Sequence, residues 1–340
     1  PPLGPVRPDE PDAGPQASLR GNFTWTLAGN AVFGATQWAV LSMIAKLGPP
    51  EMLGQYALAV AVATPVAMFT HLNLRAVLAT DAGARHLFGD YLAVRLAVTA
   101  LGLAATAALA WVPRYPEGVA GAVLLVGVAL AADNVSDIYF GAMQRAERMG
   151  MIARSMMARG VASLAGAAAG LYLGGGIVAA ALGLALGRLL VLAAYDIPRG
   201  GRGQDYSREG TRTQWELFRT ALPLGLVLML VSLTSNMPRY AVEAWLGPAD
   251  LGVFAAVAAF LAAGSTAANA LGQSATARMA RHFSRGELVE FREVAWKVTG
   301  VAAGLGVAGA AGALVLGKPL LGLVYRPEYA AHAGLLVLLM

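Results

Sequence analysis

The sequence contains no cysteine and carries little charge. Only 13% of its residues are charged, about half the share in a typical soluble protein, whereas 57% are hydrophobic. The lack of cysteine excludes disulfides and thiolate metal sites, and the four histidines do not have the spacing of metal ligands. The HExxH, GxSxG and P-loop motifs are also missing. We therefore expect no enzyme, no metal and no cofactor, and the low charge indicates a membrane-embedded chain.

Long apolar runs predict membrane-spanning helices, because a helix needs about 20 apolar residues to cross a bilayer. The runs are continuous stretches of Ala, Leu, Val and Gly, unlike the alternating pattern of about 10 residues in a barrel strand. A tenth run begins near Tyr329 and stops at Met340, so we expect a fragment that lacks its last few helices. The nine complete predicted spans are 23–45, 53–74, 91–112, 118–141, 152–173, 175–196, 217–240, 250–273 and 293–316.

One motif occurs twice, about 199 residues apart. Leu47–Ala57 is matched by Leu246–Ala255, and Ala84–Phe88 is matched by Ala280–Phe283 at a similar spacing. Solenoid repeats run roughly 20–50 residues, so this period indicates duplication of a whole bundle, as in many transporters. The first motif follows spans 1 and 7, which makes the repeat unit six helices. Six is even, so the two bundles are expected to lie parallel in the membrane.

The repeated loop has a mechanical explanation. Gly48 and Gly247 follow their helices as C-caps, and the prolines after them prevent the helices from continuing. Glu51 and Asp250 open the next helix, where an acidic side chain interacts favourably with the helix dipole. The motif therefore predicts a duplicated helical hairpin rather than a chemical site.

Polar segments divide the chain into domains. Residues 1–21 form a polar, proline-rich tail that we expect to be disordered, because it buries too little apolar surface to fold. Residues 197–215 are the only long polar interruption between spans. We predict an N-terminal six-helix lobe over 22–196, a linker over 197–215 and an incomplete C-terminal lobe over 216–340.

The basic residues predict the orientation of the chain. Of the 25 lysines and arginines, 20 lie in the N-terminal tail or around the loops after the even-numbered spans. Basic residues concentrate on the cytoplasmic side of membrane proteins, so the N-terminus is predicted to be cytoplasmic. The alternative, a nucleic-acid-binding surface, is disfavoured because the charges follow helix parity. The five on the opposite side are Lys46, Arg114, Arg239, Lys318 and Arg326.

Polar residues inside the spans are candidates for a substrate site, because charge facing lipid is costly. Arg239 follows Pro238, which kinks helices, and an arginine in a cavity is a natural partner for phosphate. The alternative is a structural ion pair with Glu243 at i+4. Arg75 either contacts substrate or extends to the cytoplasmic membrane face. The polar residues Asn236 and Gln37, in spans 7 and 1, complete the predicted substrate-binding set.

Two aspartates are candidates for ion coupling. Asp133 and Asp137 lie at i and i+4, on one face of the fourth span. Two neighbouring carboxylates raise one pKa, so protonation at this pair would couple to transport. The alternative is that both pair with nearby Arg145 or Arg148 as part of the polar helix end.

Several segments resemble a known family, the bacterial O-antigen and capsular polysaccharide flippases of the Wzx type. The similarity covers roughly residues 22–340, and its clearest patches are Ser136–Met149, Asn236–Tyr240, Ala270–Ala275 and Tyr325–Tyr329. That family belongs to the multidrug/oligosaccharidyl-lipid/polysaccharide (MOP) exporter superfamily. The resemblance implies an all-α, MATE-like polytopic membrane protein with two parallel six-helix bundles around a V-shaped cavity, the second bundle truncated here. It also implies alternating-access transport of undecaprenyl-pyrophosphate-linked oligosaccharide across the bacterial inner membrane.

The partners that the resemblance implies are the lipid-linked oligosaccharide, membrane lipids and other membrane proteins of polysaccharide assembly, with no nucleic acid. Two other transporters of the superfamily are alternatives. Drug/cation antiporters often need an acid in helix 1, and lipid II flippases are strongly basic in helices 1 and 2, whereas span 1 has no such residue. A membrane enzyme of polysaccharide assembly is a further alternative, but such enzymes have a large outer loop and the outer loops here are short.

Overall fold

The computed structural model describes residues 19–81, 86–111, 115 and 118–339, without the side chains of residues 19, 20, 23, 262–278 and 339. Residues 1–18 of the predicted 1–21 tail and the Ala84–Arg85 part of the second repeat lie outside these residues. Residues 19–21 were wrongly assigned to the tail, because they form the first turn of a helix that begins at Leu19. The described chain is almost entirely helical and contains no strand, so the predicted all-α fold is confirmed.

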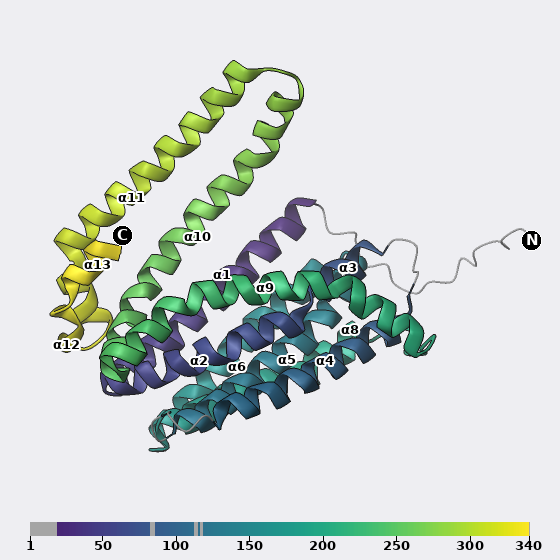
Figure 1. Ribbon diagram of the computed structural model, residues 1–340, viewed down its shortest axis with the longest axis horizontal. Helices are drawn as coiled ribbons and strands as arrows, with labels where there is room; N and C mark the ends of the chain where they lie inside the picture. The colour runs from purple at the N-terminus through teal and green to yellow at the C-terminus, as the bar shows by residue number, and fades with distance from the viewer. Residues whose placement is uncertain (1–18, 82–85, 112–114, 116–117, 340) are drawn as a thin grey trace, which may run out of the picture.

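The helices form two sets that are separated by the polar linker (Figure 1). The first set comprises α1 (Leu19–Leu47), α2 (Pro50–His71), α3 (Leu74–Thr80), α4 (Phe88–Ala110), α5 (Val119–Arg145), α6 (Met149–Tyr172), α7 (Gly176–Val191), the π-helical turn η1 (Leu192–Asp196) and α8 (Ile197–Gly200). The second set comprises α9 (Thr211–Leu246), α10 (Pro248–Ser284), α11 (Leu288–Val324), α12 (Pro327–Ala330) and α13 (Ala333–Leu339).

Each predicted span corresponds to a helix in this structure. Within the described residues, seven helical segments are long and apolar enough to cross a membrane, and α6 and α10 are not among them. Helix α6 carries Arg154 and Arg159, and the described side chains of α10 form only a short apolar stretch, Pro248–Leu261. The chain is therefore a multi-pass membrane protein.

The repeated loop forms as its residues predict. The Gly48 amide donates to the Ile44 carbonyl at 2.9 Å and ends α1. Gly247 ends α9 with a φ of 92°, a conformation that favours glycine, and its amide donates to the Glu243 carbonyl at 3.1 Å. Proline then starts the next helix in both copies.

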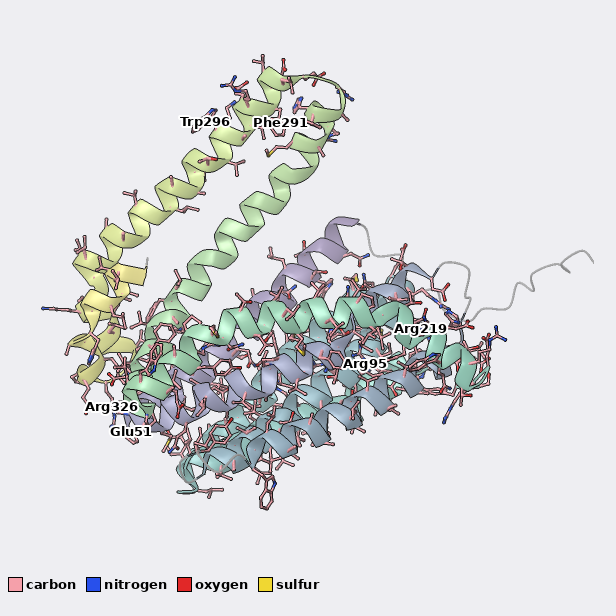
Figure 2. The ribbon with its side chains drawn as sticks, viewed as in Figure 1. Glu51, Arg95, Arg219, Phe291, Trp296 and Arg326 are labelled. Carbon is pink, nitrogen blue, oxygen red and sulfur yellow. The ribbon has the colours of Figure 1, made fainter. Side chains whose placement is uncertain are left out.

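The α10–α11 hairpin meets the rest of the helices at one end and diverges from them at the other. Figure 1 shows the α10–α11 hairpin leaving the first set at a wide angle from the region around the α9–α10 loop. We call this region the vertex and define it by residues 46–54, 246–252 and 323–326. In Figure 2, Glu51 and Arg326 lie together at the vertex, whereas Arg219 and Trp296 lie at two separate far ends. The arrangement is a V.

Helix α9 belongs to the second repeat by sequence but lies along the first helix set, against α2 and α4. Pro65 inside α2 has no amide hydrogen, which leaves the Ala61 carbonyl without its usual helical partner. The Tyr240 hydroxyl donates to this carbonyl at 2.5 Å. A proline in one repeat thus creates the acceptor that holds a helix of the other.

The linker is attached to the first helix set. Asp90, in the first turn of α4, is fully buried and accepts hydrogen bonds from the Glu209 amide and the Gln214 side chain, both at 3.1 Å. The Gly89 amide donates to the Asp205 carbonyl at 3.0 Å. These bonds fix the start of α9 against α4.

Candidate functional site

A break in the second span creates the first part of the site. Leu72 and Asn73 adopt left-handed backbone conformations, with φ of 48° and 51°, and end α2. A helix end leaves carbonyls without partners. The Arg95 guanidinium, which is fully buried, donates from Nη1 to the carbonyls of Thr70 at 3.0 Å and His71 at 2.8 Å. An arginine that would be costly among apolar helices is therefore used as a cap for the broken helix.

Asp137 contacts three basic side chains at this break in the helix. Its Oδ2 lies 3.1 Å from His71 Nε2 and 3.5 Å from Arg95 Nη2, and its Oδ1 lies 3.5 Å from Arg75 Nη1. Arg75 also donates from Nε to Gln144 Oε1 at 2.9 Å. One carboxylate from α5 thus joins the end of α2, α3 and α4.

Asp133, one turn earlier on α5, joins a different group of helices. Its Oδ1 lies 3.0 Å from Arg159 Nη1 on α6, and its Oδ2 pairs with Arg188 Nη1 on α7. Arg188 also donates from Nη2 to Gln37 Oε1 on α1 at 3.1 Å. The carboxylate therefore bridges two arginines, and one of them reaches the first span.

Asp196 supplies a second carboxylate to this group. It is fully buried at the end of η1, where its Oδ2 accepts from Arg159 Nη2 at 3.1 Å and its Oδ1 accepts from the Ser155 hydroxyl at 2.5 Å. Arg159 thus binds two carboxylates, which offsets the cost of burying its charge.

The two groups join through one aromatic ring. The guanidinium carbons of Arg75 and Arg159 lie 5.6 Å and 5.0 Å from the centre of the Phe140 ring, within cation–π range. We call the joined set the charge network: Arg75, Arg95, Arg159, Arg188, Asp133, Asp137 and Asp196.

The charge network has a buried layer and an accessible layer. The side chains of Arg95, Arg159, Arg188 and Asp196 are at most 7% exposed, whereas those of Arg75, Asp133 and Asp137 are 28%, 22% and 14% exposed. Charge buried this deeply in membrane helices indicates a functional site. The accessible layer is the part of the network that is open to solvent.

The structure brings together four of the residues singled out from sequence. Two of these four, the aspartates, have different ion-pair partners. Arg75, Gln37, Asp133 and Asp137 all belong to the network or contact it. However, Asp133 and Asp137 each have their own arginines, which are neither of the expected partners Arg145 and Arg148. The carboxylates are therefore neutralised separately and are not arranged as a pair that shares one proton.

Sequence reasoning did not single out four members of the network as site residues: Arg95, Arg159, Arg188 and Asp196. The signal was present, since each is a charged residue within or next to an apolar span. It was missed because these residues were counted as the cytoplasmic ends of spans, where charge is expected.

Arg239 and Asn236 form a smaller site on α9. Arg239 Nη1 donates to Asn236 Oδ1 at 2.5 Å, and Asn236 is buried and donates to the Ser232 carbonyl at 2.8 Å. No ion pair joins Arg239 to Glu243 in the described part of the chain. The two residues predicted to bind substrate on this span are thus direct neighbours, and the expected structural pair is not formed.

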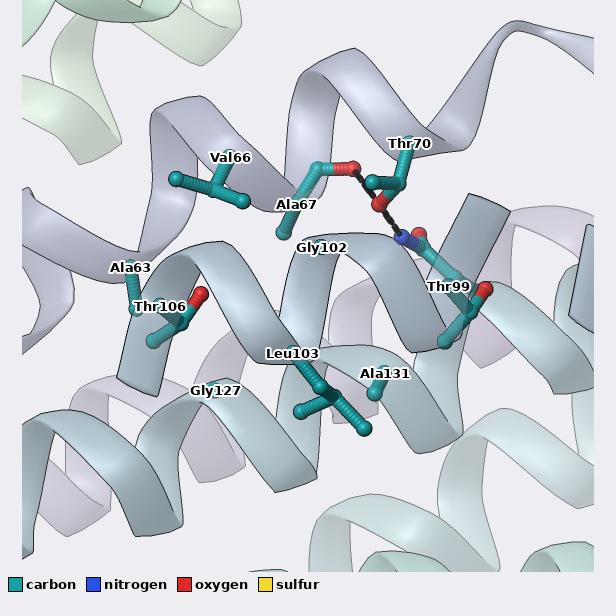
Figure 3. A pocket seen from close by; sticks show the side chains of 11 residues that line it. Ala63, Val66, Ala67, Thr70, Thr99, Gly102, Leu103, Thr106, Gly127 and Ala131 are labelled. Carbon is teal, nitrogen blue, oxygen red and sulfur yellow. Dashed lines mark hydrogen bonds between the residues drawn. The ribbon is translucent and has the colours of Figure 1, made fainter. Parts of the chain in front are cut away.

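A small cavity lies beside the network, between α2, α4 and α5 (Figure 3). Its volume is about 10 Å³, and Asn134 donates at 2.9 Å to both the Ala67 carbonyl and the Thr70 hydroxyl at its wall. This volume is close to that of one water molecule, so the cavity is a packing feature rather than a substrate pocket.

Solved structures with this fold are transporters. A multidrug resistance MATE-family transporter of the MOP superfamily, in an inward-facing conformation, aligns with a TM-score of 0.73 at 12% identity and covers 92% of this chain and 79% of that one. A MOP superfamily transporter from Pyrococcus furiosus aligns with a TM-score of 0.58 at 15% identity, covering 92% and 75%. The chain therefore has the same fold as these two transporters.

The family is narrower than the fold. Residues 20–277 match the family described as polysaccharide biosynthesis protein, and the chain belongs to this family. It is also 23% identical over 321 residues to the capsular polysaccharide biosynthesis protein CapF of Staphylococcus aureus, covering 94% of this chain and 80% of that protein. The protein is therefore a multi-pass membrane protein of the polysaccharide biosynthesis protein family.

Proposed function

We propose that the protein moves undecaprenyl-pyrophosphate-linked oligosaccharide from the cytoplasmic to the outer leaflet of the bacterial inner membrane by alternating access, with its N-terminus in the cytoplasm. The proposal rests on the net positive charge of the charge network, which contains four arginines and three aspartates. Arg239 adds a further cation that has no acidic partner among the described residues. An excess of buried positive charge favours an anion and disfavours the cationic substrate of a drug antiporter.

The donors of the site fit a pyrophosphate. Arginine binds phosphate through two parallel N–H groups and stays charged when it is buried. Among the described residues, Nε of Arg95, Arg159 and Arg188 and Nε2 of Gln37 are buried without an acceptor. Phosphate oxygens would supply acceptors to such donors.

Asp133 is the candidate for ion coupling that the geometry favours over Asp137. It is shared between Arg159 and Arg188 and is partly accessible. Protonation would remove its charge and release Arg188 for the anionic head group, whereas Arg159 would keep its pair with Asp196. Deprotonation would let Asp133 compete with the bound phosphate, which links substrate release to the proton.

The test is the amount of lipid-linked oligosaccharide in a strain that lacks the gene. We expect the deletion strain to accumulate lipid-linked oligosaccharide and the wild-type gene to restore export. Arg239→Ala should abolish export at normal expression, Arg239→Lys should restore it partly, and Arg239→Ala with Glu243→Ala should not recover because the two residues are not paired. Arg212→Ala, whose side chain is 90% exposed, is the matched control.

Two outcomes would count against these proposals. Full export by well-expressed Arg239→Ala would remove Arg239 from the substrate site. A deletion strain with normal levels of lipid-linked oligosaccharide would reject the proposed substrate itself.

A further inference from the structure

The two copies of the repeated motif contact each other at the vertex. A Cβ atom added to Gly54 on α2 would lie less than 3.0 Å from the carbonyl oxygen of Pro248, the first residue of α10. A Cβ added to Gly252 on α10 would lie equally close to the carbonyl oxygen of Pro50, the first residue of α2. Each added Cβ would also stand 3.1 Å from the amide nitrogen of the other glycine. The contact is reciprocal.

This reciprocity follows from the duplication. Gly54 and Gly252 occupy the same place in the motif, and each is four residues after the proline that starts its helix. When residue i of one unit contacts residue j of the other and the reverse also holds, the units are related by a twofold axis. Small residues let membrane helices approach closely, and here one glycine from each helix brings the two backbones into contact.

A second exchange of contacts lies beside the first. Lys46, at the end of α1, donates from Nζ to the Leu323 carbonyl at the end of α11, at 2.9 Å. Arg326, just after α11, donates from Nε to the Lys46 carbonyl, at 3.3 Å. Each cation caps the C-terminus of a helix in the other half, where the helix dipole favours positive charge.

We infer that the Gly54–Pro248 and Gly252–Pro50 contacts are the gate that closes the outer face of the transporter, and that Lys46 and Arg326 fasten it. The inference rests on the proposed function, because alternating access requires the closed end of the V to open. In Figure 2, Glu51 and Arg326 mark this end, and the opposite ends at Arg219 and Trp296 are already apart. The gate opens without breaking a buried ion pair, since its polar contacts are hydrogen bonds to carbonyls.

The absence of native cysteine makes the gate directly testable. Ala57 is one turn inward from Gly54 on the same face of α2 and is 7% exposed, so Ala57→Cys reports access past the gate. In intact cells, Gly54→Ala should raise its labelling by an impermeant maleimide several-fold, because the methyl group overlaps a backbone that cannot rotate away. Gly252→Ala should raise the labelling of Ala57→Cys in the same way. The rise in the double variant should be smaller than the sum of the two single rises, because both substitutions act on one contact.

Two further variants complete the design. Gly34→Ala on α1 adds a methyl group in open space and is the matched control, for which labelling stays at the starting level. Lys46→Ala with Arg326→Ala removes the two hydrogen bonds across the gate without adding atoms, so it should raise the labelling of Ala57→Cys by a smaller amount. This double variant tests the gate if the glycine variants do not reach the membrane.

Labelling at the control level in folded Gly54→Ala, Gly252→Ala and the Lys46/Arg326 double variant would overturn the gate. A rise in labelling combined with normal lipid-linked oligosaccharide in the deletion strain would support the gate and reject the proposed substrate. The failures of the two proposals can therefore be told apart.

Discussion

Two pairs of glycines make reciprocal backbone contacts, and they join different kinds of neighbours. Gly166 and Gly183 bring α6 against α7, which follow each other in sequence within the first helix set. Gly54 and Gly252 bring α2 against α10, which lie in different halves. Gly166 and Gly183 each begin a GxxxG spacing, which favours close packing of membrane helices. The same local geometry thus occurs inside one helix set and between the two halves.

The difference lies in what surrounds each contact. Arg159 on α6 pairs with Asp196 in the π-helical turn that follows α7, and both side chains are buried, so an ion pair that water does not reach holds the α6–α7 contact together. The α2–α10 contact has Lys46 and Arg326 bound to helix-end carbonyls instead. Separating a buried ion pair leaves an uncompensated charge, whereas a helix-end carbonyl near the membrane surface can return to water. We conclude that the first contact is permanent and the second can separate.

The largest expected effect is the loss of a carboxylate from the permanent contact. Asp196→Ala leaves Arg159 with one of its two carboxylates, and breaking a buried pair costs about 3–5 kcal/mol. We expect a large fall in the thermal unfolding temperature of the detergent-solubilised protein. Asp250→Ala at the vertex is the matched control, because Asp250 is exposed and its loss should change stability by no more than about 0.5 kcal/mol. Equal unfolding temperatures for the two variants would contradict the comparison.

A methyl group at the permanent glycine contact should have a smaller effect of another kind. Gly166→Ala forces a Cβ against the backbone of Gly183, and overpacking of this sort costs typically 1–3 kcal/mol. We expect a lower unfolding temperature with unchanged labelling of Ala57→Cys, the reverse of the pattern expected for Gly54→Ala. If Gly166→Ala raises the labelling as Gly54→Ala does, the two contacts do not differ in the proposed way.

The smallest effect is expected at a surface ion pair. Arg212 and Glu216 lie at i and i+4, with Nε and Oε1 3.1 Å apart and side chains 90% and 59% exposed. Exposed helical pairs contribute about 0.3–0.5 kcal/mol, because water and salt screen the charges. Arg212→Ala should therefore barely shift the unfolding temperature, and high salt should remove the difference. A shift as large as that of Asp196→Ala would show that burial is not what makes the network strong.

The sequence by itself determined the helices, the duplication and the membrane class. These depend on local properties: uninterrupted apolar length sets a span, and the glycine–proline motif sets where each span stops. The same motif, found twice, predicted a duplicated helical hairpin, and both copies of the motif join two helices in this way. Arg239 and Asn236 could be singled out because polar groups in a membrane helix need partners, and in the structure they bind each other.

Only the tertiary structure decided which charges meet. Asp133 and Asp137 share a helix face, yet each binds arginines from other helices, and Arg95 serves a helix end that lies 24 residues earlier in the chain. Periodicity gives the face of one helix but not the rotation and depth at which another helix presents its side chain. Pairing of charges depends on these quantities, because Coulomb energy and hydrogen-bond geometry change within a few ångströms. The charge network therefore follows from how α1 to α7 pack together. The sequence shows only that charged residues lie among apolar ones, not which of them pair.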